Sequence, residues 1–89
     1  MKIKEGFILR EIMGNYVVVA VGSASKDFRG MIKLNSTAVD IWNLLGEGKN
    51  ENEICEILLS QYDVERSQLE KDIRTTVNRL IEQGILENE

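Results

Sequence analysis

Two runs rich in β-branched and aromatic residues open the chain, at residues 7–12 and 16–21. Residues 13–15 separate them, and the Gly-Asn pair in this connection suits a tight hairpin turn. The second run is apolar throughout, which is typical of a strand with neighbours on both edges. The pattern predicts a β-hairpin whose second strand lies in the middle of a sheet.

A third strand is predicted after a polar interval. Residues 22–30 are mostly small and polar and are bounded by glycines, which indicates a loop. The sequence Met31-Ile32-Lys33-Leu34 follows as a short strand. Because no further strand-like run comes after it, we expect this strand at the edge of the sheet, with unpaired backbone N–H and C=O groups.

From Asn35 the apolar period lengthens to three or four residues, which indicates helices. The first helix is expected to start among three good N-cap residues, 35–37, and to stop at Gly46. Asn50 and Glu53 have the spacing of a capping box and predict the start of a second helix. The expected buried stripes of these two helices are Ala38, Ile41, Trp42 and Leu45, and then Ile54, Ile57, Leu58 and Tyr62.

The third helix has the clearest end. It is expected to begin between Asp63 and Ser67, where residues 67–70 have a capping-box pattern. Gly84 predicts a left-handed end, with the next residue placed to touch Leu80 as in a Schellman motif. We therefore predict an α+β, winged-helix-like fold, in which a three-stranded antiparallel sheet is followed by three helices in a single domain over residues 1–89.

Composition excludes several kinds of chemistry. The chain has no histidine and one cysteine, Cys55, so it cannot build an imidazole base, a Cys/His zinc site or an internal disulfide. Cys55 and Trp42 are expected to be core residues. We expect neither an enzyme nor a bound cofactor or metal. No apolar run approaches a membrane span and no secretory signal opens the chain, so a cytoplasmic protein without membrane contact is expected.

The net charge of −4 disfavours generic nucleic-acid binding. Residues 1–45 carry +2 and residues 46–89 carry −6. A winged-helix DNA-binding regulator stays open as an alternative, with the third helix as the recognition helix. That helix carries Arg66, Lys71, Arg74 and Arg79, but also Glu65, Glu70, Asp72 and Glu82. The acidic residues count against the alternative.

Two features point toward peptide binding. The edge strand could accept an added peptide strand. On the third helix, Val77 and Ile81 widen the apolar stripe to one side, which Glu70 and Arg74 continue. If this flank faces the third strand, the two make a groove for an extended peptide, in which Lys33 and Arg74 select side chains. The open alternatives are that another helix buries the flank, or that the edge strand pairs with a second copy in a homodimer.

Positions spread over most of the chain carry a family resemblance. They are Leu34, Asn35, Thr37, Ala38, Ile41, Trp42, Leu45, Glu53, Ile54, Leu58, Tyr62, Asp63, Val64, Asp72, Ile73, Leu80, Gly84, Ile85 and Leu86. In this pattern the chain resembles the PqqD family, named for the peptide chaperone of pyrroloquinoline quinone biosynthesis, and is similar to the RiPP recognition elements of peptide-modifying systems.

The resemblance implies a function. Members of the family bind the leader segment of a ribosomally synthesised precursor peptide as an added strand, beside the third strand and against the third helix. They present it to a modifying enzyme, often a radical SAM protein, and have no catalysis of their own. The implied peptide-binding residues are Met31, Ile32, Lys33, Leu34, Arg74, Val77 and Ile81. Proline at Ile32 or Lys33 is then expected to abolish leader binding.

Overall fold

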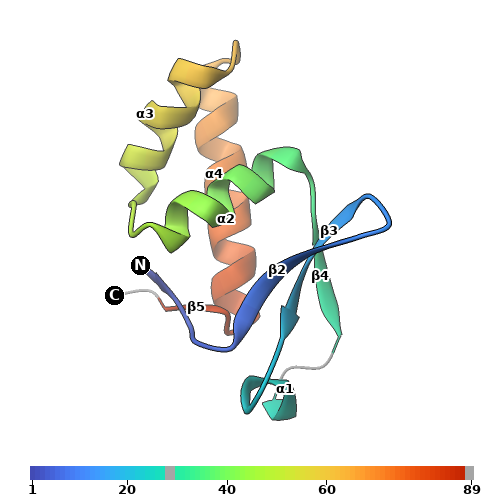
Figure 1. The fold of residues 1–89 in the computed structure, drawn as a ribbon. Helices are drawn as coiled ribbons and strands as arrows, with labels where there is room; N and C mark the ends of the chain where they lie inside the picture. Colours follow the sequence, from blue (N-terminus) through green and yellow to red (C-terminus); the bar gives the residue numbers. More distant parts are fainter. Residues whose placement is uncertain (28–29, 88–89) are drawn as a thin grey trace.

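The computed structural model describes residues 1–27 and 30–87 (Figure 1). The elements follow in the order β1 (Lys2–Ile3), β2 (Phe7–Ile12), β3 (Asn15–Ala20), α1 (Ala24–Asp27), β4 (Met31–Leu34), α2 (Ser36–Gly46), α3 (Glu51–Gln61), α4 (Arg66–Glu82) and β5 (Leu86–Glu87). Part of the loop predicted at residues 22–30 is the short helix α1. Residues 28–29 of that loop lie outside the described residues.

The predicted hairpin is confirmed. Strands β2 and β3 pair antiparallel, and Ile12 lies opposite Asn15 across a two-residue connection. Met13 and Gly14 have positive φ angles of 51° and 82°, as a type I′ turn requires at both positions. This turn fixes the register of the hairpin, because the pair that flanks a two-residue turn is hydrogen-bonded and the pairs alternate from there.

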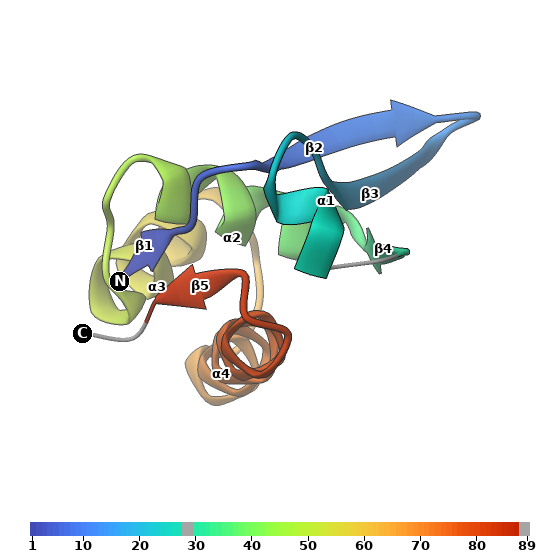
Figure 2. The same ribbon diagram turned by 90° about the horizontal axis from the view of Figure 1, so that it is seen from below.

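The sheet has the order β2-β3-β4, so β3 is central and β4 is an edge strand, as predicted. Leu9, Val18 and Ile32 share one row across the three strands. Val18 and Ile32 of this row belong to the main apolar core. Figure 2 shows β4 as the strand of the sheet on the side of helix α4. The open edge of the sheet therefore faces this helix.

The second helix, α3, begins with the predicted capping box. The Asn50 side chain accepts a hydrogen bond from the Glu53 backbone N–H (2.8 Å), and the Glu53 carboxylate accepts one from the Asn50 N–H (2.9 Å). Asn35 caps α2 in a similar way by accepting from the Ala38 N–H (2.8 Å). Tyr62, expected in the buried stripe, instead lies beyond the end of α3 and is exposed, with its hydroxyl donating to the Asp40 carboxylate.

Replacing Asn50 with alanine is expected to lower the free energy of unfolding by about 1 kcal/mol. The change removes the side-chain acceptor of the Glu53 backbone N–H at the start of α3, while the backbone N–H of residue 50 can still donate to the Glu53 carboxylate. Urea denaturation followed by circular dichroism measures the loss. Asn52→Ala, an exposed position in the first turn of the same helix, is the control and should cost much less. Equal losses for the two variants would show that the capping box contributes nothing.

Helix α4 ends as predicted, and its start at Arg66 lies within the predicted interval of residues 63–67, but it is capped differently. The Ile85 N–H donates to the Leu80 carbonyl (2.9 Å) and the Gly84 N–H to the Ile81 carbonyl (3.0 Å), which are the two bonds of a Schellman motif. At the other end the N-cap residue is Glu65, without a side-chain cap, so the capping box predicted at residues 67–70 is wrong. The helix starts earlier, and Ser67 lies within its first turn.

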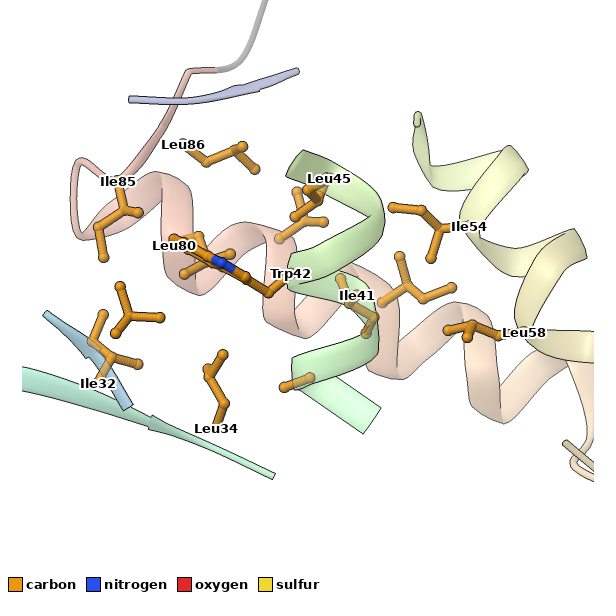
Figure 3. Packing of buried hydrophobic residues seen from close by; sticks show 14 of the residues in the cluster. Ile32, Leu34, Ile41, Trp42, Leu45, Ile54, Leu58, Leu80, Ile85 and Leu86 are labelled. Carbon is orange, nitrogen blue, oxygen red and sulfur yellow. The ribbon is translucent and has the colours of Figure 1, made fainter. Parts of the chain in front are cut away.

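The core lies between the helices and the inner face of the sheet (Figure 3). Its largest fully buried side chains include Ile41, Ile54 and Leu80. Trp42 and Cys55 are 7% and 3% exposed, which confirms that both are core residues. The side chains of Trp42 from α2 and Leu80 from α4 belong to the same buried cluster (Figure 3), and the two helices are in contact.

The predicted α+β arrangement of a three-stranded antiparallel sheet and helices is confirmed, with one addition. Strand β1 pairs with β5 in a separate two-stranded sheet, in which Lys2 lies opposite Glu87. The Lys4 N–H also donates to the Ile85 carbonyl (2.8 Å). These bonds place the start of the chain against the end of α4. Of the helices that the structure describes, none has the length and apolar character to cross a membrane.

Candidate functional site: an open sheet edge beside helix α4

The backbone of Lys33 points away from the sheet. Arg10 lies opposite Val17 in the hairpin. Because hydrogen-bonded pairs alternate along the strands and the pair that flanks the turn is hydrogen-bonded, this pair, two positions further along, is hydrogen-bonded as well. Val17 thus directs its N–H and C=O toward β2. Lys33 lies opposite Val17 on its other side, so the pair between β3 and β4 at this row is not hydrogen-bonded. The N–H and C=O of Lys33 are therefore directed outward, toward α4.

Arg79 of helix α4 confirms this orientation. Its Nη1 donates a hydrogen bond to the Lys33 carbonyl oxygen at 3.3 Å, across the open edge of β4. Both the guanidinium and the strand edge are exposed at this point. The contact is at the long end of the range for N–H···O bonds, so it holds the strand edge weakly.

A groove of about 470 Å³ separates β4 from α4. Its floor is apolar and consists of Leu34, Ala38 and Leu80, which are 4%, 7% and 0% exposed. The remaining lining residues are polar: Lys33, Asn35, Thr37, Lys71, Asp72, Thr75, Thr76 and Arg79. The groove combines unpaired backbone groups on one wall with an apolar floor and hydroxyl and charged groups on the other wall. These are the features that an added strand needs for main-chain pairing and side-chain selection.

The groove is locally positive although the chain carries a net charge of −4. The basic side chains of Lys71 and Arg79 line its helix wall, against one carboxylate, that of Asp72, while the Lys33 side chain points to the outer face of the sheet. Asp72 already accepts a hydrogen bond from Gln68 on the same helix (2.9 Å). The basic side chains on this wall outnumber the single carboxylate, so the groove favours a negatively charged ligand.

The outer face of the sheet is apolar next to this edge. Ile8, Val19 and Met31 form one row across the three strands, and Ile8 and Met31 are 36% and 59% exposed. Val17 in the adjacent row is 5% exposed although it is not part of the main core. The neighbours of Val17 in that row are Arg10 and Lys33, whose aliphatic stems can cover it while their charges stay in water. A strand added to β4 would continue this face.

The strand residues predicted for the site lie together on β4, but they are not equivalent. Met31 and Lys33 are exposed, whereas Ile32 and Leu34 are 5% and 4% exposed and face the core. Only Leu34 of the two inward residues also lines the groove. Met31 and Lys33 share one backbone orientation in the strand, so both direct their N–H and C=O groups outward.

The helix residues predicted for the site do not line this groove. Arg74 points to the other side of α4, where its Nε is 3.1 Å from a Glu51 carboxylate oxygen of α3. Val77 is 1% exposed and belongs to the core. Ile81 is half-buried and packs against the edge of that core. The physical reason is that α3 packs against the flank that holds Arg74, so a different flank of α4 faces β4.

Sequence reasoning missed the residues that form the helix wall of the groove. Lys71, Thr75 and Arg79 recur every fourth residue and so form one line along α4. The signal was present in the spacing of these polar residues beside Leu80. This spacing does not by itself predict a groove, because the sequence does not show which element packs against each flank of the helix.

Cys55 lies in an environment that disfavours its thiolate form. Burial raises the pKa of the Cys55 thiol above its usual value, and the nearby Arg66 guanidinium only partly opposes this. The thiol therefore stays protonated and inert at neutral pH. Within residues 1–27 and 30–87 there is no cluster of three or more acidic or cysteine side chains that could hold a metal ion.

The fold and the groove define the class: a winged-helix-like α+β domain with an open edge strand facing its last long helix. The family model for Coenzyme PQQ synthesis protein D (PqqD) matches residues 15–86. The chain belongs to the PqqD family.

Two solved structures have the same fold over nearly their whole length. TbiB1 in complex with the TbiA(beta) leader peptide is 27% identical, with a TM-score of 0.79 over 100% of this chain and 98% of that one. The lasso peptide synthetase B1 complexed with its leader peptide is 25% identical, with a TM-score of 0.77 over 98% of this chain and 96% of that one. No curated protein matches the sequence.

Proposed function

We propose that the chain is a RiPP recognition element: it binds the leader segment of a ribosomally synthesised precursor peptide as an additional β-strand on β4. Membership of the PqqD family supports this proposal, as do the two similar proteins whose structures hold leader peptides. The observation that carries it in this chain is the outward orientation of the Lys33 backbone into a groove with an apolar floor.

The geometry defines how such a peptide would lie. A strand that pairs with β4 uses the outward N–H and C=O groups of Met31 and Lys33. Its side chains then alternate between two surroundings. Those opposite Ile32 and Leu34 point inward, over Leu80 and against Thr76 of α4. Those opposite Met31 and Lys33 point outward and extend the outer face of the sheet, and the one opposite Met31 continues the apolar row of Ile8 and Met31.

The energetics favour moderate affinity. Ordering an extended peptide costs about 1–2 kcal/mol per residue in backbone entropy. This cost offsets much of the free energy that is gained by pairing along a four-residue strand and by covering the Leu34, Ala38 and Leu80 floor. Because affinity differences between related complexes lie mostly in the dissociation rate, a moderately bound peptide leaves quickly. Fast release suits a protein that hands its peptide on.

We further propose that the partner that receives the peptide is a modifying enzyme, of the radical SAM type or another class, and that this chain supplies no catalytic group. The exposed row of Ile8 and Met31 lies next to the peptide edge and would be available to such a partner. On this proposal residues 1–89 act as one binding domain in the cytoplasm. The DNA-binding alternative has no support from the comparisons. Helix α4, which would be the recognition helix, carries acidic side chains among the basic ones.

The proposal is tested by fluorescence polarisation with two labelled peptides, the leader half and the core half of a precursor encoded beside the gene. The leader half is expected to bind and the core half is not. Sedimentation at several protein concentrations checks in parallel whether β4 instead pairs with a second copy of the chain. Equal binding of both halves, or a constitutive dimer that no leader dissociates, would contradict the proposal.

A further inference from the structure

The three arginines of helix α4 differ in their partners. Arg66 pairs with Glu56 at 2.6 Å, and Arg74 pairs with Glu51 at 3.1 Å. Arg79 instead donates to the Lys33 carbonyl. Within residues 1–27 and 30–87, no carboxylate lies within ion-pair distance of Arg79, and Glu82, three residues along the same helix, does not pair with it. Arg79 is thus a cation beside the groove whose charge is not compensated there.

Arg79 also occupies a backbone group that an added strand requires. The Lys33 carbonyl is one of the outward acceptors on β4, and a peptide that pairs at this row donates to the same oxygen. The Arg79 guanidinium lies across the strand edge where this peptide N–H would lie, so the two donors compete for the Lys33 carbonyl oxygen. The present bond of Arg79 is long and exposed, so little is lost when it breaks. A displaced guanidinium gains most from a carboxylate, which accepts two parallel bonds from it.

We propose that the peptide recognised by this groove carries an acidic side chain, and that Arg79 is a specificity residue that transfers from the Lys33 carbonyl to this carboxylate when the peptide pairs with β4. The inference rests on the proposed function and adds the chemistry of one peptide position to it. In the unbound protein Arg79 covers an open strand edge, which is one way in which edge strands are protected from unwanted pairing.

The register assigns the acidic residue to an inward-pointing position. A peptide residue directly opposite Lys33 directs its side chain to the outer face of the sheet, away from α4. Its neighbour opposite Leu34 points into the groove, where Thr76 and Arg79 form the helix wall. Lys71 lies two turns away along the same line and adds positive charge. The Asp72 carboxylate does not pair with Arg79 and instead accepts a hydrogen bond from Gln68 on the same helix (2.9 Å).

A selection from random 12-residue peptides displayed on phage tests the inference with the full chain. The chain is immobilised at 0.15 M salt, and the consensus peptide is then synthesised for polarisation titrations. We expect one enriched Asp or Glu, whose change to the amide weakens binding to the unchanged protein about fivefold. The same peptide change should alter binding to Arg79→Gln less than about twofold, because the partner of the carboxylate is already absent.

Arg74→Gln is the matched control, since it removes an arginine from the same helix on the flank that faces α3, and it should behave like the unchanged protein. Selected peptides that bind at β4 without an acidic preference would overturn the role of Arg79 and leave the proposed function intact. An equal effect of the amide peptide on the unchanged protein and on Arg79→Gln would do the same. If no peptide is enriched, or if Lys33→Pro does not weaken binding, both proposals are overturned.

Discussion

Replacing Lys33 with proline is expected to reduce leader-peptide affinity at least about tenfold while the domain stays folded. The N–H of Lys33 is directed outward, so proline removes a donor that only an added strand would use. Its ring also occupies the space in which the peptide backbone would lie. Loss of one hydrogen bond costs about 1 kcal/mol and the steric obstruction adds to it, whereas about 1.4 kcal/mol already changes the dissociation constant tenfold.

The fold tolerates proline at this position because the N–H of Lys33 makes no hydrogen bond within the sheet. Proline is accepted on edge strands where its missing N–H faces away from the sheet. The obvious neighbour is not an equivalent test: Ile32 is 5% exposed and directs its backbone groups toward β3, so Ile32→Pro would break the β3–β4 ladder. The expectation that proline at either position would act alike is therefore corrected by the register.

Two control variants separate the loss of backbone pairing with the peptide from the loss of the Lys33 charge and from a general effect of proline in the sheet. Lys33→Gln removes the charge and keeps the N–H, so it should retain most of the affinity. Glu11→Pro introduces proline on the opposite edge strand, at another position whose N–H faces away from β3, and should leave binding unchanged. Circular dichroism checks the fold of each variant. A folded Lys33→Pro protein that binds the leader normally would rule out the added strand.

Replacing Trp42 with alanine is expected to lower the free energy of unfolding by about 3–5 kcal/mol. The indole is 7% exposed and belongs to the same buried cluster as Leu80 of α4 (Figure 3). Its removal leaves a cavity where the helices meet under the floor of the groove. Since small domains have only about 5–15 kcal/mol of stability, the variant would lose a large fraction of its stability.

Urea denaturation followed by far-ultraviolet circular dichroism measures this loss, because the variant lacks the tryptophan that fluorescence would follow. Tyr16→Ala is the aromatic control: Tyr16 is 38% exposed on β3, and its removal should cost about 1 kcal/mol or less. A Trp42→Ala protein as stable as the control would show that the helices do not depend on this side chain.

The elements that the sequence predicted are those with local signals. The hairpin turn at Met13 and Gly14, the Asn50 capping box and the Gly84 helix end each depend on residues that are close together in the sequence. The β1–β5 pair escaped prediction because each strand has two residues and their pairing joins opposite ends of the sequence. Local patterns contain no information about such a contact.

The sequence predicted the strand wall of the candidate groove but not the residues of its helix wall. The edge position of β4 followed from the absence of a later long strand, and its four residues were identified correctly as an edge strand. For α4, the sequence defined a buried stripe but not the neighbour of each flank. The Arg74–Glu51 contact assigns one flank to α3, and Arg79 then marks the flank that faces β4. The orientation of α4 relative to β4 is therefore apparent only when α3, α4 and β4 are seen packed together.

The measurement that tests the central claim most directly is an NMR titration of ¹⁵N-labelled protein with the leader half of the precursor. Pairing of the leader peptide with β4 predicts the largest shifts at the amides of Met31 and Lys33 and along residues 75–79 of α4. It also predicts nuclear Overhauser effects between the peptide backbone and β4. Shifts confined to α3 or to the outer edge of β2, with the amides of β4 unchanged, would contradict it.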